Sequence, residues 1–315
     1  MACSKSETKP VDIEKPAEED QENPAEDDKI PTTNYGIIQL GFLEGFNTQP
    51  IEKIFAQQRI RELSGLAGSH KYPGVLYMHG DSKNSPILIT NHQGEALGEI
   101  ILDGFSTVDP EDISVGPGPQ DGKSYIYFAD IGDNDRKRSS ITIYRFEEPS
   151  IDLLKANSAY KISAKDVSKL QMTYPKEKFN AESLLVDPLT KDVFIITKET
   201  YKAKVFRAAY PQKENTVLTQ VLNMQSFDLF TAAAISFDGS EILIRNKSQI
   251  WYWKRDAKQS VVEALLHAPL KAPYVGNEHQ GEGISFSADA QGYFTNSEVK
   301  DWPELQSKLS FYQHN

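Results

Sequence analysis

A short pattern recurs at five points along the chain and constrains its fold more than any other feature. In each copy, a small or acidic residue precedes an apolar residue by two positions at the start of a strand-like segment. The five pairs are Ser64/Leu66, Glu111/Ile113, Glu182/Leu184, Ala233/Ile235 and Glu282/Ile284, at intervals of 47, 71, 51 and 49 residues. A repeat of about fifty residues made of short β segments is typical of a β-propeller, in which each repeat forms one blade.

The sequence therefore predicts an all-β fold, a single β-propeller of five or six four-stranded blades. The 71-residue interval is too long for one plain blade and too short for two, so the blade number stays open. Only 33 residues follow Glu282, which is short for a complete blade. The stretch 35–60 is expected to supply the missing outer strand and close the ring, which removes exposed sheet edges. Short helices are expected only at 150–158 and 302–309.

Charge and apolar content divide the chain into an N-terminal segment, 1–31, and a propeller domain, 32–315. Residues 4–31 hold ten acidic and four basic side chains, so they carry −6 of the net charge of −11. Low hydropathy with high charge and repeated proline predicts a disordered acidic tether. The remaining residues carry only −5, the difference between −11 and −6. This balance gives no electrostatic footprint for nucleic acid.

The single cysteine, Cys3, excludes an intrachain disulfide and a thiolate metal cage. Its setting, Ala2-Cys3-Ser4 ahead of a long polar segment, predicts a bacterial lipoprotein cleavage site whose apolar signal region is missing, with the lipid on Cys3. On this interpretation the protein belongs to the bacterial cell envelope, facing the periplasm or sorted to the outer membrane, and touches the membrane only through its lipid. The alternative is a free cysteine in a soluble cytosolic protein.

The repeat also predicts where function lies. In a blade, the start of the innermost strand lies beside the end of the second strand, because the two strands are antiparallel. Glutamates at equivalent starts should therefore meet near one axis, together with polar residues that end the second strands. The residues expected to hold a metal ion are Glu111, Glu182, Glu282, Asp130, Asp133 and Asn134.

Three interpretations of this acidic rim remain open. Crowded carboxylates repel one another, and a calcium ion would relieve the repulsion because it takes six to eight oxygen ligands. Basic residues could instead pair with the glutamates in an internal ion-pair network, or could hold an anionic ligand. The residues expected to bind such a ligand are Lys198, Arg245, Asn246 and Glu298.

No catalytic residue is assigned, because the sequence lacks the G-x-S-x-G, H-E-x-x-H and P-loop motifs. Ser64 is expected to be a turn residue rather than a nucleophile, and His79 and His279 to serve packing or hydrogen bonding.

Several of these segments together resemble a family of bacterial exported proteins. They are Glu62–Ala67, Asp109–Ile113, Asp130–Asn134, Ile143–Pro149, Ala181–Pro188, Thr231–Ser236 and Gly281–Ile284. The resemblance spans about residues 60–300. It implies a largely uncharacterised family of propeller fold, similar at a greater distance to phytase-like propellers, which bind calcium and can act on phosphate esters.

The chain departs from this pattern at three points. Pro110 stands where the family has an aromatic residue, and Asn180 and Ala234 stand where it has carboxylates. The three glutamates and the Asp130–Asn134 loop remain. We therefore expect a monomeric, calcium-binding envelope propeller that binds a small anionic, carbohydrate or protein ligand. The alternative function is a calcium-dependent hydrolase of a phosphate ester or lactone.

Overall fold

The computed structural model describes residues 1, 30–35, 39–56, 58–155, 157–276 and 278–315. The chain separates into the units Met1–Ile30 and Pro31–Asn315. The acidic segment and Cys3 lie almost wholly outside the described residues, so their predicted disorder and lipidation stay predictions. In the described part of the chain, no helix is long and apolar enough to cross a membrane.

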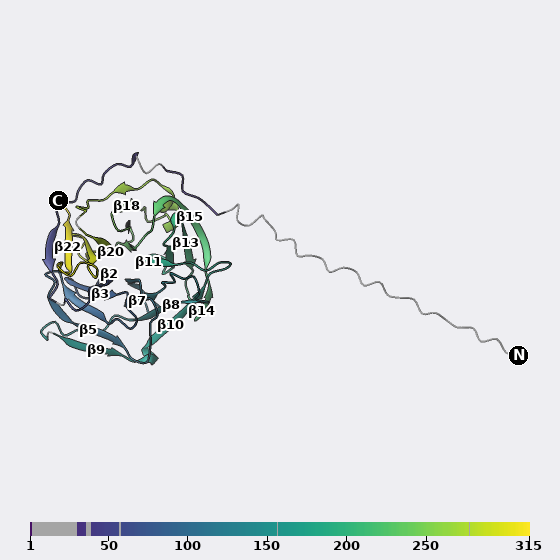
Figure 1. Cartoon of the computed structure of the whole chain (residues 1–315), viewed down its shortest axis with the longest axis horizontal. Helices are drawn as coiled ribbons and strands as arrows, with labels where there is room; N and C mark the ends of the chain where they lie inside the picture. Colours follow the sequence, from purple (N-terminus) through teal and green to yellow (C-terminus); the bar gives the residue numbers. More distant parts are fainter. Residues whose placement is uncertain (2–29, 36–38, 57, 156, 277) are drawn as a thin grey trace. The chain divides into compact units, whose positions relative to one another are not determined.

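Residues 31–315 form a five-bladed β-propeller (Figure 1). The predicted fold is confirmed, and five is the observed blade number. The innermost strands are β2 (Leu63–Gly68), β6 (Asp112–Pro117), β11 (Ala181–Val186), β16 (Ala232–Ile235) and β20 (Gln280–Phe286). Each contacts the next in chain order, and β20 contacts β2, so the five strands surround one axis.

The remaining strands complete the blades outward from these five. In order from the inside, blade 1 adds β3 (Val75–Gly80), β4 (Ile87–Asn91), β5 (Ala96–Leu102) and β9 (Ser158–Ile162). Blade 2 adds β7 (Ser124–Asp130), β8 (Ile141–Glu147), β10 (Val167–Thr173) and β14 (Asn215–Val217). Blade 3 adds β12 (Val193–Thr197), β13 (Thr200–Ala208) and β15 (Thr219–Asp228). Blade 4 adds β17 (Glu241–Arg245), β18 (Ile250–Lys254) and β19 (Leu270–Lys271). Blade 5 adds β21 (Gly292–Glu298), β22 (Lys308–Gln313) and β1 (Ile51–Ile54).

The ring is closed by the N-terminal strand β1, as the sequence predicts. It pairs antiparallel with the last strand, β22, with Ile51 opposite Phe311 and Ile54 opposite Lys308. Blade 5 is thus built from both ends of the propeller domain, and β22 has no free edge. Because closure joins residues far apart in the sequence, opening any blade must break this ladder or an interface between blades.

Two blades carry a fifth strand that the sequence analysis did not predict. The chain leaves blade 2 after β8, lays β9 parallel to β5 on the outer edge of blade 1, and returns through a 3-10 helix (Ala164–Asp166) to β10. In the same way β14, which lies between β13 and β15, pairs parallel with β10 of blade 2. The first excursion explains the 71-residue interval, since it adds one strand without adding a blade.

The two short helices expected from the sequence are absent. Residues 151–155 form turns and bends that lead into β9, and 302–305 form turns that lead into β22. The observed α-helix, α1, is Val261–Leu266 between β18 and β19. It begins with a capping box in which Ser260 Oγ accepts from Glu263 N and the Glu263 carboxylate accepts from Ser260 N. Val261, Ala264 and Leu265 face the core between blades 3 and 4.

The core lies between neighbouring blades. The described residues form five apolar clusters, each drawing on two adjacent sheets. Between blades 1 and 2, for example, Tyr77 and Ala67 pack with Ile113 and Phe128. Both faces of each sheet are therefore covered, which explains why second strands such as β12 and β17 read as nearly continuous apolar runs.

Ring closure gives a test of the fold. A chain lacking residues 1–30 should keep its melting temperature within about 2 °C, because every strand of the five blades lies in residues 51–313. A chain lacking residues 1–56 loses β1 and the buried rings of Phe46 and Phe55, and should melt at least 10 °C lower. Differential scanning calorimetry of the two truncations checks this. Equal melting temperatures would contradict a closing role for β1.

Candidate axial site

Three glutamates from three blades converge at one end of the axis. Glu111 directly precedes β6, Glu182 is the second residue of β11, and Glu282 is the third residue of β20. Their exposed fractions are only 7%, 4% and 8%. Each lies at the start of an inner strand, so all three belong to the same face of the propeller. Their carboxyl groups interact electrostatically with one another.

β-bulges occur at the starts of three inner strands, and two of them contain Glu182 and Glu282. In β11, Ala181 lies opposite Thr197 but Ser183 lies opposite Ile196, which leaves Glu182 as the extra residue. β20 gains one residue between Gly281 and Ile284, and β2 gains one between Leu63 and Leu66. A bulge turns the local side chains out of the regular pleat, and bulges are frequent beside functional sites.

Two bulge positions require glycine because neighbouring blades approach closely there. A Cβ on Gly65 would lie 2.7 Å from Ile113 N on β6, and a Cβ on Gly283 would lie 2.5 Å from the Ser64 carbonyl oxygen. Ser64 itself is a contact between blades rather than a nucleophile. Its hydroxyl donates to the Glu111 carbonyl oxygen at 2.5 Å.

Lys198 lies among the glutamates. It follows β12, where its backbone N–H donates to the Asn180 carbonyl at 3.0 Å, and its ammonium pairs with the Glu182 carboxylate. Burial alone would lower the pKa of Lys198, but the charges of Glu182, Glu282 and Glu111 outweigh burial and raise it. A second ammonium, that of Lys247, lies 3.7 Å from Glu282 Oε1 and is more exposed.

The glutamates hold protons unusually well. Burial, and then the neighbouring charge of Glu182, raise the pKa of Glu111 well above its ordinary value. The same two causes raise the pKa of Glu282 to about 7. Burial also raises the pKa of Glu182, although Lys198 opposes this effect. The cluster therefore has acidic groups that change charge near neutral pH.

The Asp130–Asn134 loop lies against Glu111, but its two carboxylates accept hydrogen bonds from residues of this loop and its neighbours. Asp130 Oδ1 accepts from Asp109 N and from Arg138 Nη1, both at 2.9 Å. Asp133 accepts from the backbone N–H groups of Lys137 and Arg138 at 2.8 and 2.9 Å.

The loop backbone is what approaches the glutamate. A Cβ on Gly132 would lie 2.5 Å from Glu111 Oε1. The third predicted loop ligand, Asn134, accepts from Asn180 Nδ2 at 3.1 Å. Among the described residues, no three His, Cys, Asp or Glu side chains are grouped so as to hold a metal ion. Glu182 is instead paired with Lys198, and Glu282 lies 3.7 Å from the ammonium of Lys247.

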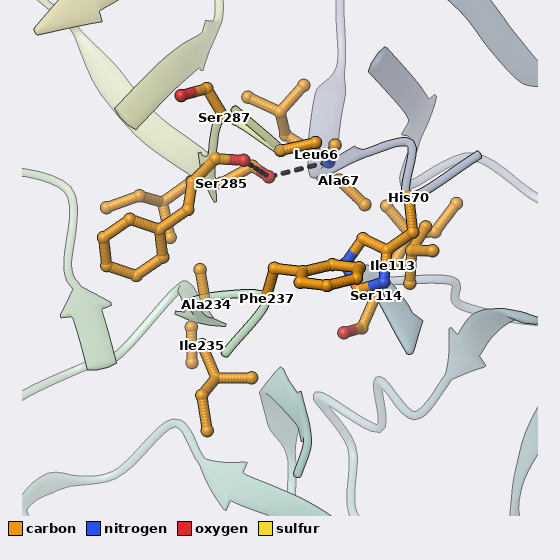
Figure 2. A pocket seen from close by; sticks show the side chains of 16 residues that line it. Leu66, Ala67, His70, Ile113, Ser114, Ala234, Ile235, Phe237, Ser285 and Ser287 are labelled. Atoms are coloured by element: carbon orange, nitrogen blue, oxygen red, sulfur yellow. Dashed lines mark hydrogen bonds between the residues drawn. The ribbon is translucent and has the colours of Figure 1, made fainter. Parts of the chain in front are cut away.

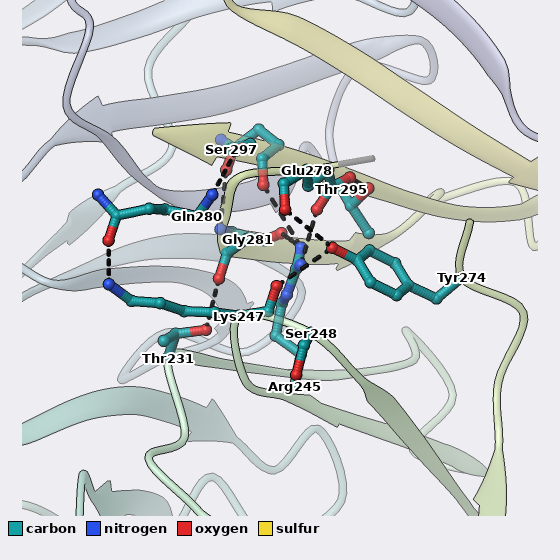
Figure 3. Close-up of polar contacts among 12 residues, drawn as sticks. Thr231, Arg245, Lys247, Ser248, Tyr274, Glu278, Gln280, Gly281, Thr295 and Ser297 are labelled. Atoms are coloured by element: carbon teal, nitrogen blue, oxygen red, sulfur yellow. Dashed lines mark hydrogen bonds and ion pairs between the residues drawn. The ribbon is translucent and has the colours of Figure 1, made fainter. Parts of the chain in front are cut away.

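The predicted ligand-binding residues other than Lys198 are engaged within the protein. The guanidinium of Arg245 is fully buried, with Nη2 2.7 Å from Glu278 Oε2 and Nη1 3.0 Å from the Gly283 carbonyl, as Figure 3 shows for its contact with Glu278. It therefore supports β20 directly below Glu282.

The other two ligand-binding candidates also have protein partners. Asn246 caps a turn by accepting from Ser248 N and Gln249 N at 2.9 and 2.8 Å. Glu298 Oε2 accepts from Gln280 Nε2 at 2.8 Å.

Two buried acids that matter to the site were missed as site residues from the sequence. Glu278 lies in the loop before β20 and neutralises Arg245. Asp112 is fully buried near the axis, where it accepts from Ile113 N at 2.9 Å and Leu184 N at 2.8 Å. The signal for Asp112 was its place beside Glu111 at the start of an inner strand. The signal for Glu278 was only that a buried arginine needs an acidic partner.

The fold places the protein in the class of five-bladed β-propellers. No family model and no curated protein matches the chain. Among solved structures, it is similar to the WD40 repeats of RRP9, with 9% identity and a TM-score of 0.42 over 86% of this chain and 100% of that chain. It is also similar to a gluconolactonase from Xanthomonas campestris, with 10% identity and a TM-score of 0.39 over 76% of this chain and 68% of that one.

The buried glutamates predict a pH-dependent effect of Glu282→Gln. Because the folded state raises the pKa of Glu282 from 4.5 to about 7, it favours the neutral carboxyl. Stability from this group is full below the unfolded pKa and is lost as pH rises through about 7. Glutamine, which cannot ionise, should therefore change stability little at pH 5 and increase it at pH 8.5, by up to about 3 kcal/mol.

Urea unfolding in the presence of a chelator, at both pH values, measures this difference. The matched control is Glu44→Gln, a change at an exposed glutamate, which should show no such difference. If Glu282→Gln is equally destabilising at both pH values, the carboxyl is ionised throughout and the proposed proton-holding cluster is wrong.

Proposed function

We propose that this protein is a ligand-binding module whose binding site is the axial glutamate cluster. The observation that carries the proposal is the convergence of Glu111, Glu182 and Glu282 from three separate blades. Three bulges interrupt the regular ladders at this end of the axis, and bulges are frequent beside functional sites. Burying three carboxyl groups together costs stability, and binding is a function that would retain them.

The ligand that this cluster favours is cationic. Three carboxyl groups outnumber the two ammonium groups beside them, those of Lys198 and Lys247, so full ionisation leaves an excess of negative charge. Calcium fits this excess by its preference for carboxylate oxygens. Since Glu182 is paired with Lys198, calcium would have to displace this ammonium and release the proton that Glu282 holds below about pH 7.

Proton release makes calcium binding pH-dependent. Affinity should rise at least tenfold from pH 6 to pH 8, because Glu282 loses its proton over this range. Isothermal titration of the metal-stripped protein measures affinity and, in buffers of different ionisation enthalpy, the protons released. Glu182→Gln should abolish binding, whereas Glu44→Gln should leave it unchanged.

An absence of calcium binding at pH 8 would overturn the cation assignment. The same samples, with and without calcium, can be tested for turnover of phosphate esters and lactones. Turnover that Glu111→Gln abolishes without a change in melting temperature would favour the hydrolase alternative. That alternative draws on the pKa of Glu111, which burial raises well above its ordinary value beside the lysine-paired Glu182, an arrangement suited to acid–base chemistry.

We also propose that the module is tethered to the bacterial cell envelope through a lipid on Cys3. The support is the sequence alone, namely the small residues that flank the cysteine and the acidic, proline-containing segment that follows. About 0.8 kcal/mol per buried methylene makes acyl chains sufficient as an anchor.

Mass spectrometry of the native protein purified from its own cells tests the anchor. The N-terminal peptide should begin at Cys3 and carry a diacylglyceryl group, and Cys3→Ser should move the protein to the soluble fraction. An unmodified Cys3 in the native protein would end this proposal. The axial site would be unaffected.

A further inference from the structure

The propeller has a cavity on the face opposite the glutamates. The inner strands begin at the glutamate face, so their last residues, such as Gly68 of β2 and Pro117 of β6, lie at the other end of the axis. There the loops of blades 1 to 4 enclose a cavity of about 480 Å³. This volume is in the range of small-molecule sites, which is about 300–1,000 Å³.

One wall of the cavity is aromatic. Phe237 follows β16 and is 57% exposed, an unusual state for a phenylalanine on a closed fold. Its ring meets that of His70 edge to face, with 4.4 Å between centroids, and Figure 2 shows the two rings together beside a small pocket between the inner strands. Burial lowers the pKa of His70 to about 4, so its imidazole is neutral at pH 7. Pro117 and Pro188 also line the cavity.

The charges around the cavity leave one lysine without a carboxylate partner. Glu148 is buried and accepts from the hydroxyls of Ser69, Tyr77 and Ser124. Glu147 pairs with Lys123 at 2.7 Å.

The remaining lining charge is that of Lys71. Among the described residues its ammonium contacts only Ser150 Oγ at 3.2 Å, the Glu148 carbonyl oxygen at 3.5 Å and the Tyr72 ring. Both carboxylates of the lining are thus satisfied within the protein, and the charge of Lys71 is free to meet a ligand.

We propose that this cavity binds a small aromatic anion, with its ring against Phe237 and its carboxylate or sulfonate at Lys71. The aromatic wall would contribute edge-to-face or stacked contacts. Lys71 would contribute a charge-assisted hydrogen bond. The site lies on the other face from the glutamate cluster and depends on none of its residues, so it stands independently of the proposed calcium site.

The experiment uses 2-naphthoate as the probe and the full chain as the protein. Fluorescence titration should show saturable binding with one site per chain, and calcium or chelator should not change it. Phe237→Ala and Lys71→Glu should each weaken binding at least fivefold. Both residues are exposed, so their melting temperatures should stay within about 2 °C of the unaltered chain.

The chain offers a matched control pair. Phe42 is 76% exposed and has the ammonium of Lys271 5.6 Å from its ring centroid, but neither residue lines this cavity. Phe42→Ala and Lys271→Glu should therefore leave 2-naphthoate binding unchanged. This pair separates cavity binding from adsorption to any exposed ring beside a lysine.

Three results would overturn the proposal. The first is an absence of saturable binding at millimolar 2-naphthoate. The second is equal affinity in the Phe237→Ala and Phe42→Ala variants. The third is equal affinity for 2-naphthylmethylamine, a cation of the same shape, which would show that the cavity does not select an anion.

Discussion

The carboxylate of Asp112 is the interaction on which the centre of this propeller depends. It accepts hydrogen bonds from Ile113 N in its own strand and from Leu184 N in β11, and lies 3.5 Å from Ala233 N in β16. Strands of three blades are thereby connected through one fully buried acid, and burial raises its pKa well above the ordinary value. Backbone donors, rather than a basic side chain, partly offset the cost of burying the group. Glu111 and Glu182 lie at the starts of β6 and β11, so this carboxylate helps to fix both of their positions.

Much of the architecture followed from local patterns in the sequence. The recurrence from Ser64/Leu66 to Glu282/Ile284 predicted the propeller, and the short C-terminal repeat predicted closure by the N-terminal strand. The sequence pattern could not reveal which segments of one repeat pair with the blade of another. Residues 158–162 form β9 because the edge of β5 is available to them, and that edge belongs to another repeat. The helix α1 escaped notice because it has only six residues, about the length at which helical periodicity is no longer distinct.

For the candidate site too, the sequence predicted where residues lie but not which groups they contact. Position along each repeat was enough to select Glu111, Glu182 and Glu282, since equivalent positions lie at equivalent places in the ring. The sequence could not predict which groups these charged side chains pair with, because that depends on distances between blades. Arg245 thus supports β20 through Glu278, and Asp130 and Asp133 stabilise their own loop. The bulges of β2 and β20 leave a trace in the sequence as Gly65 and Gly283, and the need for glycine there is a property of blade spacing.

The interleaved outer strands bear on how the chain folds during synthesis. Blade 1 is not complete until β9 emerges from within the second repeat, and blade 2 is not complete until β14 emerges from within the third. During synthesis, the outer edge of each of these two blades therefore stays unpaired until a later repeat supplies the strand that covers it. The ring closes last, when β22 pairs with β1. Strand β1 is made early but has no partner until nearly the whole domain has been synthesised. Such an order favours a sequential, N-to-C assembly in which no early repeat folds to completion alone.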